Sequence, residues 1–313
     1  MTAVQRPLAG FALNLSVSES DDSEGRGYPA WQVNRVTLQL VAALFGQGAS
    51  LVFGHDWRED GVMEAVYGFA RQIQPPIPLV PEHAEDEGQP LLCNLLPWPD
   101  KPFLDERDLE RLASTLRVEL VGLPPELVDF IRDNRLQEGG DGIHRYLRAR
   151  ALTFLRHRIN EVSDVRLCLG GRRAGAQGRY PGVIEEALLA IREDKPLYLA
   201  GFLGGATEQV IDAIEGKPMP GSFCVSSPVT ELYNNPPVKE SAVGTQADRA
   251  CDREGIWKEF SNAGYDWLAQ HNGLTAEENR ALLHTSVLDE VIELVLVGLS
   301  RLYRDKNQHR RAE

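Results

Sequence analysis

The chain has 313 residues, of which 42% are hydrophobic and 25% charged, so its composition is that of a globular protein and not of a disordered one. Its formal net charge is −13. This charge argues against a dedicated DNA- or RNA-binding surface, because such surfaces bind mainly by neutralising phosphates. A small anionic ligand is still compatible with it, since backbone amides and a few arginines can hold a phosphate inside an acidic protein.

The cysteines and the hydrophobic runs indicate a cytoplasmic protein. Four cysteines lie far apart and form no C-x-x-C pair: Cys93, Cys168, Cys224 and Cys251. We expect reduced thiols here, not a zinc site or a disulfide framework. The N-terminus lacks the charged leader and long apolar core of a signal peptide. The longest apolar run, 291–299, is interrupted by Glu293 and is too short to span a bilayer. We therefore expect no metal, no cofactor and no membrane contact.

Short apolar runs alternate with segments of helical periodicity as far as residue 214. Strands that are separated by helices of this length imply βαβ crossovers, so the pattern predicts a doubly wound, mainly parallel α/β fold. Continuous apolar strands also fit a sheet that is covered on both faces. The predicted strands are 11–18, 50–53, 91–95, 117–123, 165–169 and 196–200. The predicted helices are 32–45, 61–72, 105–116, 140–160, 183–192 and 207–214.

The composition changes near residue 221, where Ser, Pro, Asn and Gly become frequent. We expect residues 1–220 to form the α/β domain, 221–252 an extended polar loop, and 253–313 helices that pack on the same domain. The last of these helices has an apolar stripe: Leu288, Val291, Ile292, Val295 and Leu299. We interpret the stripe as packing on the domain, with a partner or self-association surface as the alternative.

Two glycine-rich turns follow neighbouring predicted strands. GGRRAGAQGRYPG comes after Leu169, and GFLGGAT comes after Ala200 and leads into a helix that Thr207 could cap. In a parallel sheet ligands bind beyond the carboxyl ends of the strands, where free N–H groups and helix dipoles attract anions. Glycines admit a phosphate close to the backbone, and arginine binds it bidentately. The turns therefore predict a nucleotide-type site. Neither G-x-G-x-x-G nor the Walker motif is present in the sequence. Their absence argues against NAD-dependent redox chemistry and against triphosphate hydrolysis by those routes.

Two carboxylates, Glu185 and Glu186, follow Pro181-Gly182 in the first turn of a predicted helix. One interpretation is that the helix dipole stabilises them at the surface. The other is that one of them points into the site, where it holds a ribose hydroxyl or takes part in acid–base chemistry.

The segment 152–191, LTFLRHRINEVSDVRLCLGGRRAGAQGRYPGVIEEALLAI, resembles the core of the SLOG superfamily, which includes the DNA-processing Smf proteins, the cytokinin-activating LOG enzymes and nucleotide sensors. The pattern of that superfamily is a helix with an arginine, an S-D-A sequence, an apolar strand, a glycine turn, and a helix with glutamate in its first turn. The matching parts here are Arg156, 163–165, 167–169, Gly170-Gly171, Pro181-Gly182, Glu185 and Glu186. Segments 51–70 and 272–302 are similar to other parts of sensor-type and bacterial members. The resemblance implies a Rossmann-like nucleotide-binding domain.

The chain departs from the LOG enzymes at their P-G-G-x-G-T-x-x-E motif. Leu169 stands where the proline should be, the turn is longer, and the G-T pair is missing. The longer turn resembles the sensor-type branch, whose members recognise ADP-ribose-type ligands in melastatin-family channels and in bacterial antiviral systems. The loop after the first strand is acidic, so we expect phosphate to lie nearer the arginines of 172–179; its acidic residues are Glu19, Asp21, Asp22 and Glu24.

The resemblance leads to three functional hypotheses. The first is a sensor of ADP-ribose, cyclic ADP-ribose or another NAD metabolite, acting with a separate effector protein. The second is a LOG-like nucleotide N-glycosidase that uses Arg156 with Glu185 or Glu186. The third is a structural or partner protein that has lost the pocket. Convergence of Arg156, a glutamate and the Gly170 turn would favour the enzyme, and an open basic cradle at 172–180 would favour the sensor. LOG relatives are commonly dimers, so we also expect self-association.

In the sensor hypothesis each expected contact has a chemical role. Amides hold phosphate, arginines neutralise it, Tyr180 stacks on a base and the glutamates bind ribose. His55 and Asp56 line the opposite wall. The alternative role for His55 is that of a turn residue that forms a hydrogen bond with the backbone. The full set of expected ligand contacts is Ser18, Gly54, His55, Asp56, Gly170, Gly171, Arg172, Arg173, Arg179, Tyr180, Gly182, Glu185, Glu186, Gly201, Gly204, Gly205, Ala206 and Thr207.

Overall fold

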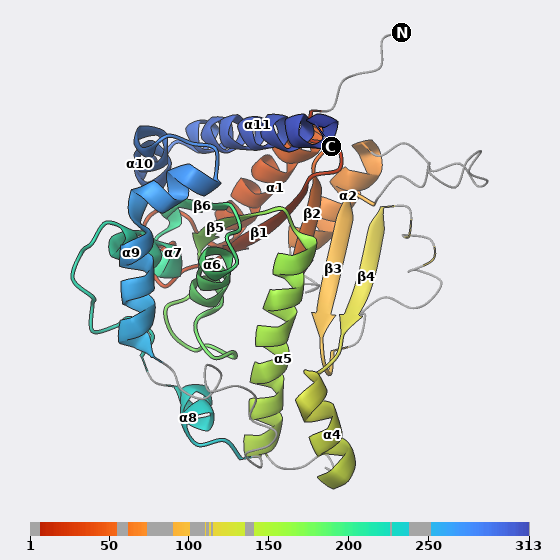
Figure 1. The fold of residues 1–313 in the computed structure, drawn as a ribbon, viewed down its shortest axis with the longest axis vertical. Helices are drawn as coiled ribbons and strands as arrows, with labels where there is room; N and C mark the ends of the chain where they lie inside the picture. The colour runs from red at the N-terminus through yellow and green to blue at the C-terminus, as the bar shows by residue number, and fades with distance from the viewer. Residues whose placement is uncertain are drawn as a thin grey trace.

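A computed structural model shows that the protein has a doubly wound α/β fold. The structure describes residues 7–54, 62–73, 90–100, 110, 113, 115–134, 141–225, 227–237 and 252–312. In these residues the sheet has six strands, all parallel, in the order β4-β3-β2-β1-β5-β6 (Figure 1). The strands are β1 (Ala12–Ser18), β2 (Ser50–Gly54), β3 (Leu92–Pro97), β4 (Leu116–Val121), β5 (Val165–Gly170) and β6 (Leu197–Ala200). The predicted fold class is confirmed, and all six predicted strands are present.

The helices that cover the sheet are also close to the predicted ranges. They are α1 (Ala30–Gly46), α2 (Val62–Ile73), α4 (Pro125–Asn134), α5 (Asp141–Val162), α6 (Gly182–Arg192), the 3₁₀ turn η1 (Gly201–Leu203) and α7 (Gly205–Ile214). Helices α8 (Pro228–Asn234), α9 (Arg253–His271), α10 (Ala276–His284) and α11 (Leu288–Ala312) follow. Helix α1 ends at Gly46, and Gly48 takes the positive φ of +89° that terminates helices, as the sequence predicts.

Two helical segments differ from the expectation. Helix α4 was not predicted, although Pro125 at its start and Glu126 in its first turn are typical helix-initiating residues. Helix α8 lies in the segment 221–252 that we expected to be an extended loop. Its N-cap is Ser227, whose hydroxyl accepts a hydrogen bond from the Thr230 N–H, and Pro228 follows the cap. Both helices are short, and hydrophobic periodicity is a weak signal at that length. Most of the predicted helix 105–116 lies outside the described residues.

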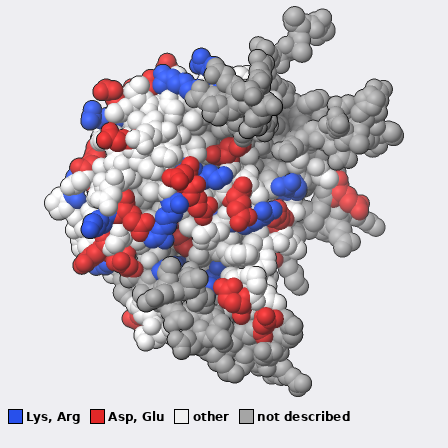
Figure 2. Space-filling view, in the orientation of Figure 1, with Lys and Arg blue, Asp and Glu red and all other residues white. Residues whose placement is uncertain are grey.

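Helices cover both faces of the sheet (Figure 1), and buried side chains lie on both of them. Leu13, Leu51 and Leu167 point to the face that α1, α2 and α11 cover. Val52 and Cys93 point to the opposite face, where α5 packs, and α6 and α7 extend this layer over β5 and β6. The strands are apolar in both directions because neither face is open to water. Figure 2 shows basic and acidic side chains side by side on the outer surface.

The C-terminal helices pack on the same sheet. Along α11, Val291, Val295 and Leu299 are buried in one cluster with α1 and the strands. The Tyr198 hydroxyl of β6 donates to the Asn272 carbonyl at the end of α9, over 2.5 Å. This supports the interpretation of the apolar stripe as a packing surface within the chain. No helix among the described residues is long and apolar enough to cross a membrane.

If α11 is part of the core, Leu299→Ala should lower the free energy of unfolding by about 2–5 kcal/mol, as for other buried leucines. The expected loss is independent of protein concentration, because the contacts are within one chain. Urea denaturation at two protein concentrations measures both quantities. Glu293→Ala, an exposed change on the same helix, is the control and should be nearly silent. A loss that appears at low protein concentration alone would identify the stripe as a subunit interface instead.

The start of α10 should make a small contribution to acid sensitivity. Hydrogen bonds from Arg301 and from the Thr275 N–H lower the pKa of Glu278 from 4.5 to about 2. A lowered folded-state pKa stabilises the protein above the unfolded value, and this contribution is lost as pH falls from about 4.5 through about 2. Because the pair is largely solvated, we expect less than about 1 kcal/mol. Melting temperatures between these pH values should fall less steeply in Glu278→Gln than in the parent, whereas the neighbouring Glu277→Gln should leave the slope unchanged.

Candidate functional site

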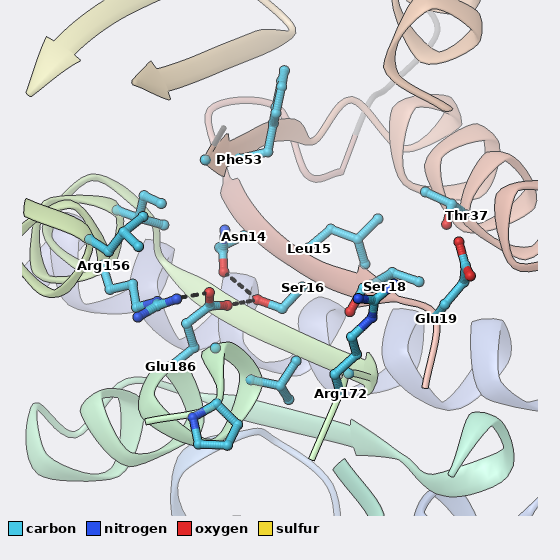
Figure 3. A pocket seen from close by; sticks show the side chains of 18 of the residues that line it. Asn14, Leu15, Ser16, Ser18, Glu19, Thr37, Phe53, Arg156, Arg172 and Glu186 are labelled. Atoms are coloured by element: carbon cyan, nitrogen blue, oxygen red, sulfur yellow. Dashed lines mark hydrogen bonds and ion pairs between the residues drawn. The ribbon is translucent and has the colours of Figure 1, made fainter. Parts of the chain in front are cut away.

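A cavity of about 460 Å³ lies at the carboxyl ends of β1, β2 and β5. This is the point where the strand order reverses, because β2 lies on one side of β1 and β5 on the other. Ligands in open parallel sheets bind at such a switch point. The cavity is lined by the end of β1, by α1, α2 and α5, and by the turn between β5 and α6 (Figure 3).

The wall between β1 and α6 contains a network centred on Glu186. Glu186 Oε2 accepts a hydrogen bond from Arg166 Nη1 over 2.7 Å and a second from the Ser16 hydroxyl. Its Oε1 lies 3.5 Å from Arg156 Nε. Ser16 also lies 3.1 Å from Asn14 Oδ1. Figure 3 shows Arg156 and Glu186 pointing toward each other at one end of the cavity.

The two arginines of this network are positioned differently. Arg166 lies in β5 and is fully buried, so its guanidinium has no contact with water. Glu186 supplies the opposite charge. Arg156 projects from α5 beneath the turn, where a Cβ at Gly178 would collide with its guanidinium and one at Gly182 would lie 3.1 Å from Nη2. Burial opposes the charge on Arg156, but Glu185 and Glu186 outweigh that effect and raise its pKa.

Glu185 lies behind the cavity wall and is 3% exposed. Its carboxylate pairs with Arg156 and accepts from the Thr153 hydroxyl. Thr153 Oγ1 in turn lies 3.4 Å from the hydroxyl of Tyr233 in α8. Of the two glutamates, Glu186 therefore lines the cavity and Glu185 holds Arg156 in place.

The first glycine turn forms the opposite end of the cavity. Gly171 lies in the wall with φ +86°, and a Cβ there would collide with Val183. Arg172 follows it, with an exposed side chain that also lines the cavity (Figure 3). Helix α6 begins beside them, and Pro181 provides no side-chain cap for its first N–H groups. This end has the free N–H groups, the dipole and the cation of an anion-binding site.

The second glycine turn does not open into this cavity. The Gly205 N–H donates to Asp22 Oδ1 over 3.1 Å, and the Ala206 N–H donates to the Gly171 carbonyl over 2.8 Å. Gly205 has φ +70°, and a Cβ there would collide with the Gly171 carbonyl. The lack of a side chain at Gly205 therefore allows the two turns to pack against each other. The expected cap at Thr207 is wrong: Gly204 is the N-cap of α7, and the Thr207 hydroxyl is buried without a hydrogen-bond partner in the described chain.

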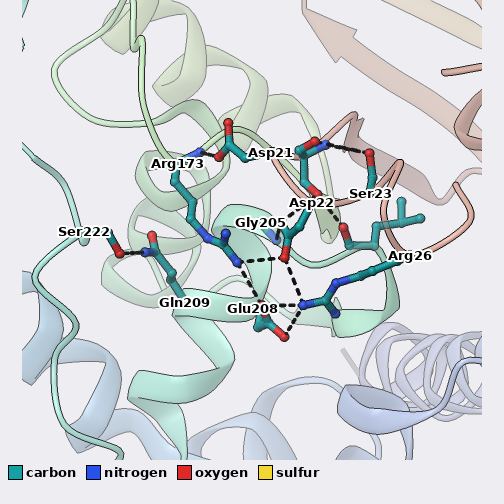
Figure 4. A network of polar contacts seen from close by, with 11 residues as sticks. Asp21, Asp22, Ser23, Arg26, Arg173, Gly205, Glu208, Gln209 and Ser222 are labelled. Atoms are coloured by element: carbon teal, nitrogen blue, oxygen red, sulfur yellow. Dashed lines mark hydrogen bonds and ion pairs between the residues drawn. The ribbon is translucent and has the colours of Figure 1, made fainter. Parts of the chain in front are cut away.

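Three further side chains of the first turn lie away from the cavity. Arg173 pairs with Asp22 and Glu208, at 3.0 and 2.9 Å (Figure 4). Arg179 is 9% exposed and lies over the rings of Tyr180 and Tyr233. Tyr180 is buried in the core around α6 and α9, so the structure does not support its expected stacking on a base. These three residues line a separate, smaller hollow of about 160 Å³ together with Arg253, so the basic groups expected for the sensor lie next to the cavity and not in it.

The remaining expected residues are distributed as follows. Ser18 and Gly54 line the cavity, as does Gly182. Gly170, with φ +66°, turns the chain next to the Ser18 carbonyl and lies outside the lining, as do Gly204, Gly205, Ala206 and Thr207. Gly201 lines a separate hollow beside α7 and α10. His55 and Asp56 lie outside the described residues.

The expected cysteine chemistry can be compared with the structure in part. Cys93, Cys168 and Cys224 are buried free thiols, and Cys251 lies outside the described residues. Burial raises the pKa of Cys168 to about 12, so this thiol is unreactive. Within the described ranges, no group of three or more His, Cys, Asp or Glu side chains is placed to hold a metal.

Four residues of the site were not predicted from the sequence: Asn14, Ser16, Arg166 and Asp22. The first three are polar residues inside strands that are otherwise apolar on both faces. Since a buried charge or amide requires a partner, such residues are a usable signal for a polar site. Asp22 was expected only as a member of an acidic loop that repels phosphate; its contacts have no local signal, because its partners Arg173 and Gly205 are more than 150 residues away.

The fold is that of a doubly wound, Rossmann-like α/β protein, with a cavity at the switch point of the sheet. Residues 7–282 match the family model described as SLOG cluster2. The chain therefore belongs to the SLOG cluster2 family, which confirms the resemblance found in the sequence. Searches of curated proteins and of solved structures gave no match.

The Arg166–Glu186 pair should be important for stability. Arg166→Met leaves Glu186 without its closest cation in a largely buried position, and we expect a loss of about 3 kcal/mol in the free energy of unfolding. Adding Glu186→Gln should recover part of this loss, because the uncompensated charge is then absent. A double-mutant cycle by urea denaturation measures the coupling between the two residues. Additive losses would contradict a direct interaction.

Proposed function

We propose that the cavity binds a nucleotide-derived ligand, with ADP-ribose, cyclic ADP-ribose and other NAD metabolites as the first candidates. The observation that supports this most directly is the state of the Glu186 carboxylate. Its Oε2 already accepts from Arg166 and Ser16, which fills the two acceptor positions of that oxygen. Its Oε1 has a looser, 3.5 Å contact with Arg156 and keeps acceptor capacity toward the cavity. A ribose hydroxyl supplies the matching donor.

The two ends of the cavity suit the other parts of a nucleotide. Phosphate fits the end at Gly171 and Arg172, where the start of α6 adds its N–H groups and dipole. A base fits the apolar wall that Phe53, Met63 and Leu155 supply. A volume of about 460 Å³ is within the range of small-molecule sites, roughly 300–1,000 Å³.

Hydrolysis of an N-glycosidic bond is the second candidate. It is favoured by the convergence of Arg156, Glu186 and the first glycine turn at one cavity. In this reaction the carboxylate would stabilise an oxocarbenium-like ribosyl group. We place it second because Glu186 already contacts two guanidinium groups and a hydroxyl, which hold its carboxylate in the wall of the cavity.

Calorimetric titration with AMP, ADP-ribose, cyclic ADP-ribose and NAD, followed by product analysis of each mixture, tests both functions. We expect saturable binding with the ligand intact. Arg172→Ala and Glu186→Gln should each weaken binding about tenfold or more, since each removes a charge-assisted hydrogen bond. Arg192→Ala is the matched control, because this arginine of α6 pairs with Glu259 outside the cavity.

Release of free base that is lost in Glu186→Gln would identify a hydrolase in place of a sensor. Equal losses in Arg172→Ala and Arg192→Ala would argue against this cavity as the site. Absence of binding by all four nucleotides would contradict the proposed function.

A further inference from the structure

The loop after β1 supplies an anion to the start of α7. The Asp22 carboxylate accepts from the Gly205 N–H over 3.1 Å through Oδ1, and its Oδ2 lies 3.0 Å from both Arg26 Nη2 and Arg173 Nη2 (Figure 4). Gly204 makes this approach possible, since a Cβ at that residue would lie 2.6 Å from Asp22 Oδ2. An N–H at a helix start together with two guanidinium groups is the environment that proteins provide for a phosphate oxygen.

Further contacts hold the carboxylate there. Glu208 of α7 pairs with Arg26 and Arg173, at 2.8 and 2.9 Å. Asp21 accepts from the Arg173 N–H over 2.8 Å. The cluster thus contains three carboxylates and two guanidinium groups, so a phosphate added beside them meets net negative charge. Burial of Asp22 acts against its ionisation, but Arg173 and Arg26 outweigh this and lower its pKa, so the carboxylate is charged at neutral pH.

The first glycine turn has the opposite character. Arg172 is exposed to the cavity, and the start of α6 has no side-chain cap. Both turns follow a strand and precede a helix, and both contain paired glycines. The difference between the turns is that the Asp22 side chain fills the anion position at the start of α7, whereas no side chain caps the start of α6.

We infer that Asp22 is a specificity-determining residue: its carboxylate occupies the phosphate position at the start of α7 and restricts the anionic groups of the ligand to Gly171, Arg172 and the start of α6. This inference rests on the proposed function and narrows the ligand class. A ligand with a pyrophosphate must keep both phosphates at the first turn. A ligand that needs two separate phosphate positions, one on each turn, is excluded.

The experiment uses inorganic phosphate as the probe and the melting temperature of the whole chain as the readout. Asp22→Ala removes the internal anion and leaves the Gly205 N–H, Arg26 and Arg173 facing an empty position. We expect replacement of chloride by phosphate at matched ionic strength and pH to raise the melting temperature of Asp22→Ala clearly more than that of the parent. Adding Arg173→Ala to this variant should remove most of the additional rise.

Two further variants make the outcome decisive. Asp22→Ser keeps a polar side chain but removes the charge and vacates most of the position, so it replaces Asp22→Ala if that variant folds poorly; it too should gain a phosphate response. Arg173→Ala in the parent should leave the response to phosphate unchanged, because Arg173 there already pairs with Asp22. Equal responses in the parent and both Asp22 variants, or a response of the parent that depends on Arg173, would overturn the inference.

The probe also separates this inference from the proposed function. Inorganic phosphate tests the start of α7 whether or not the cavity binds a nucleotide. If no nucleotide binds but Asp22→Ala gains the phosphate response, the proposed function fails and the role of Asp22 as an internal anion stands. If nucleotides bind but Asp22→Ala gains no phosphate response, the proposed function stands and the role of Asp22 as an internal anion fails.

Discussion

The structure depends on a charge that the fold encloses completely. Arg166 lies in β5, between β1 and β6, in a sheet whose two faces are covered, and a guanidinium in that position is tolerated only with a close anionic partner. Glu186 is that partner, and it is the fifth residue of α6, so the ion pair fixes the start of this helix against β1 and β5. The position of α6 in turn decides where its uncapped N–H groups point, how the first glycine turn covers Arg156, and which oxygen of Glu186 faces the cavity. A single electrostatic requirement of the interior therefore sets the geometry of the candidate site.

Most of the fold followed from the sequence because its signals are local and strong. Continuous apolar runs such as Leu197–Ala200 allow few alternatives to a buried strand, and the helices between the strands leave little freedom in topology. The convergence of Arg156, a glutamate and the first turn was named from the sequence as the arrangement that would favour the enzyme hypothesis, and the structure brings Arg156 and Glu186 together at the cavity. Helices α4 and α8 were not predicted, because a short helix is stabilised mainly by tertiary contacts, such as those of Tyr233 with Tyr146 and Thr153.

The errors in the site come from interactions between distant parts of the chain. Two turns of similar composition received the same interpretation, but Asp22 fills one and leaves the other open. Arg173 and Tyr180 are the correct residue types for a phosphate and a base, yet one is paired with Asp22 and the other is buried. Composition identifies which groups are available for binding, and only the folded chain shows which of them are already satisfied internally.

The length of α5 has a mechanical consequence. This helix has 22 residues, and at about 1.5 Å per residue it is roughly 33 Å long. Arg156 and Ile159 near one end touch the cavity, whereas Arg148 and Arg150 nearer the other end are tied to Asp100 and to Glu126 of α4. A packed helix resists bending, so a displacement of Arg156 along its axis would be transmitted to the region where α4 and α8 contact α5. The cavity wall and that region, about two turns of helix apart, are joined by one packed element.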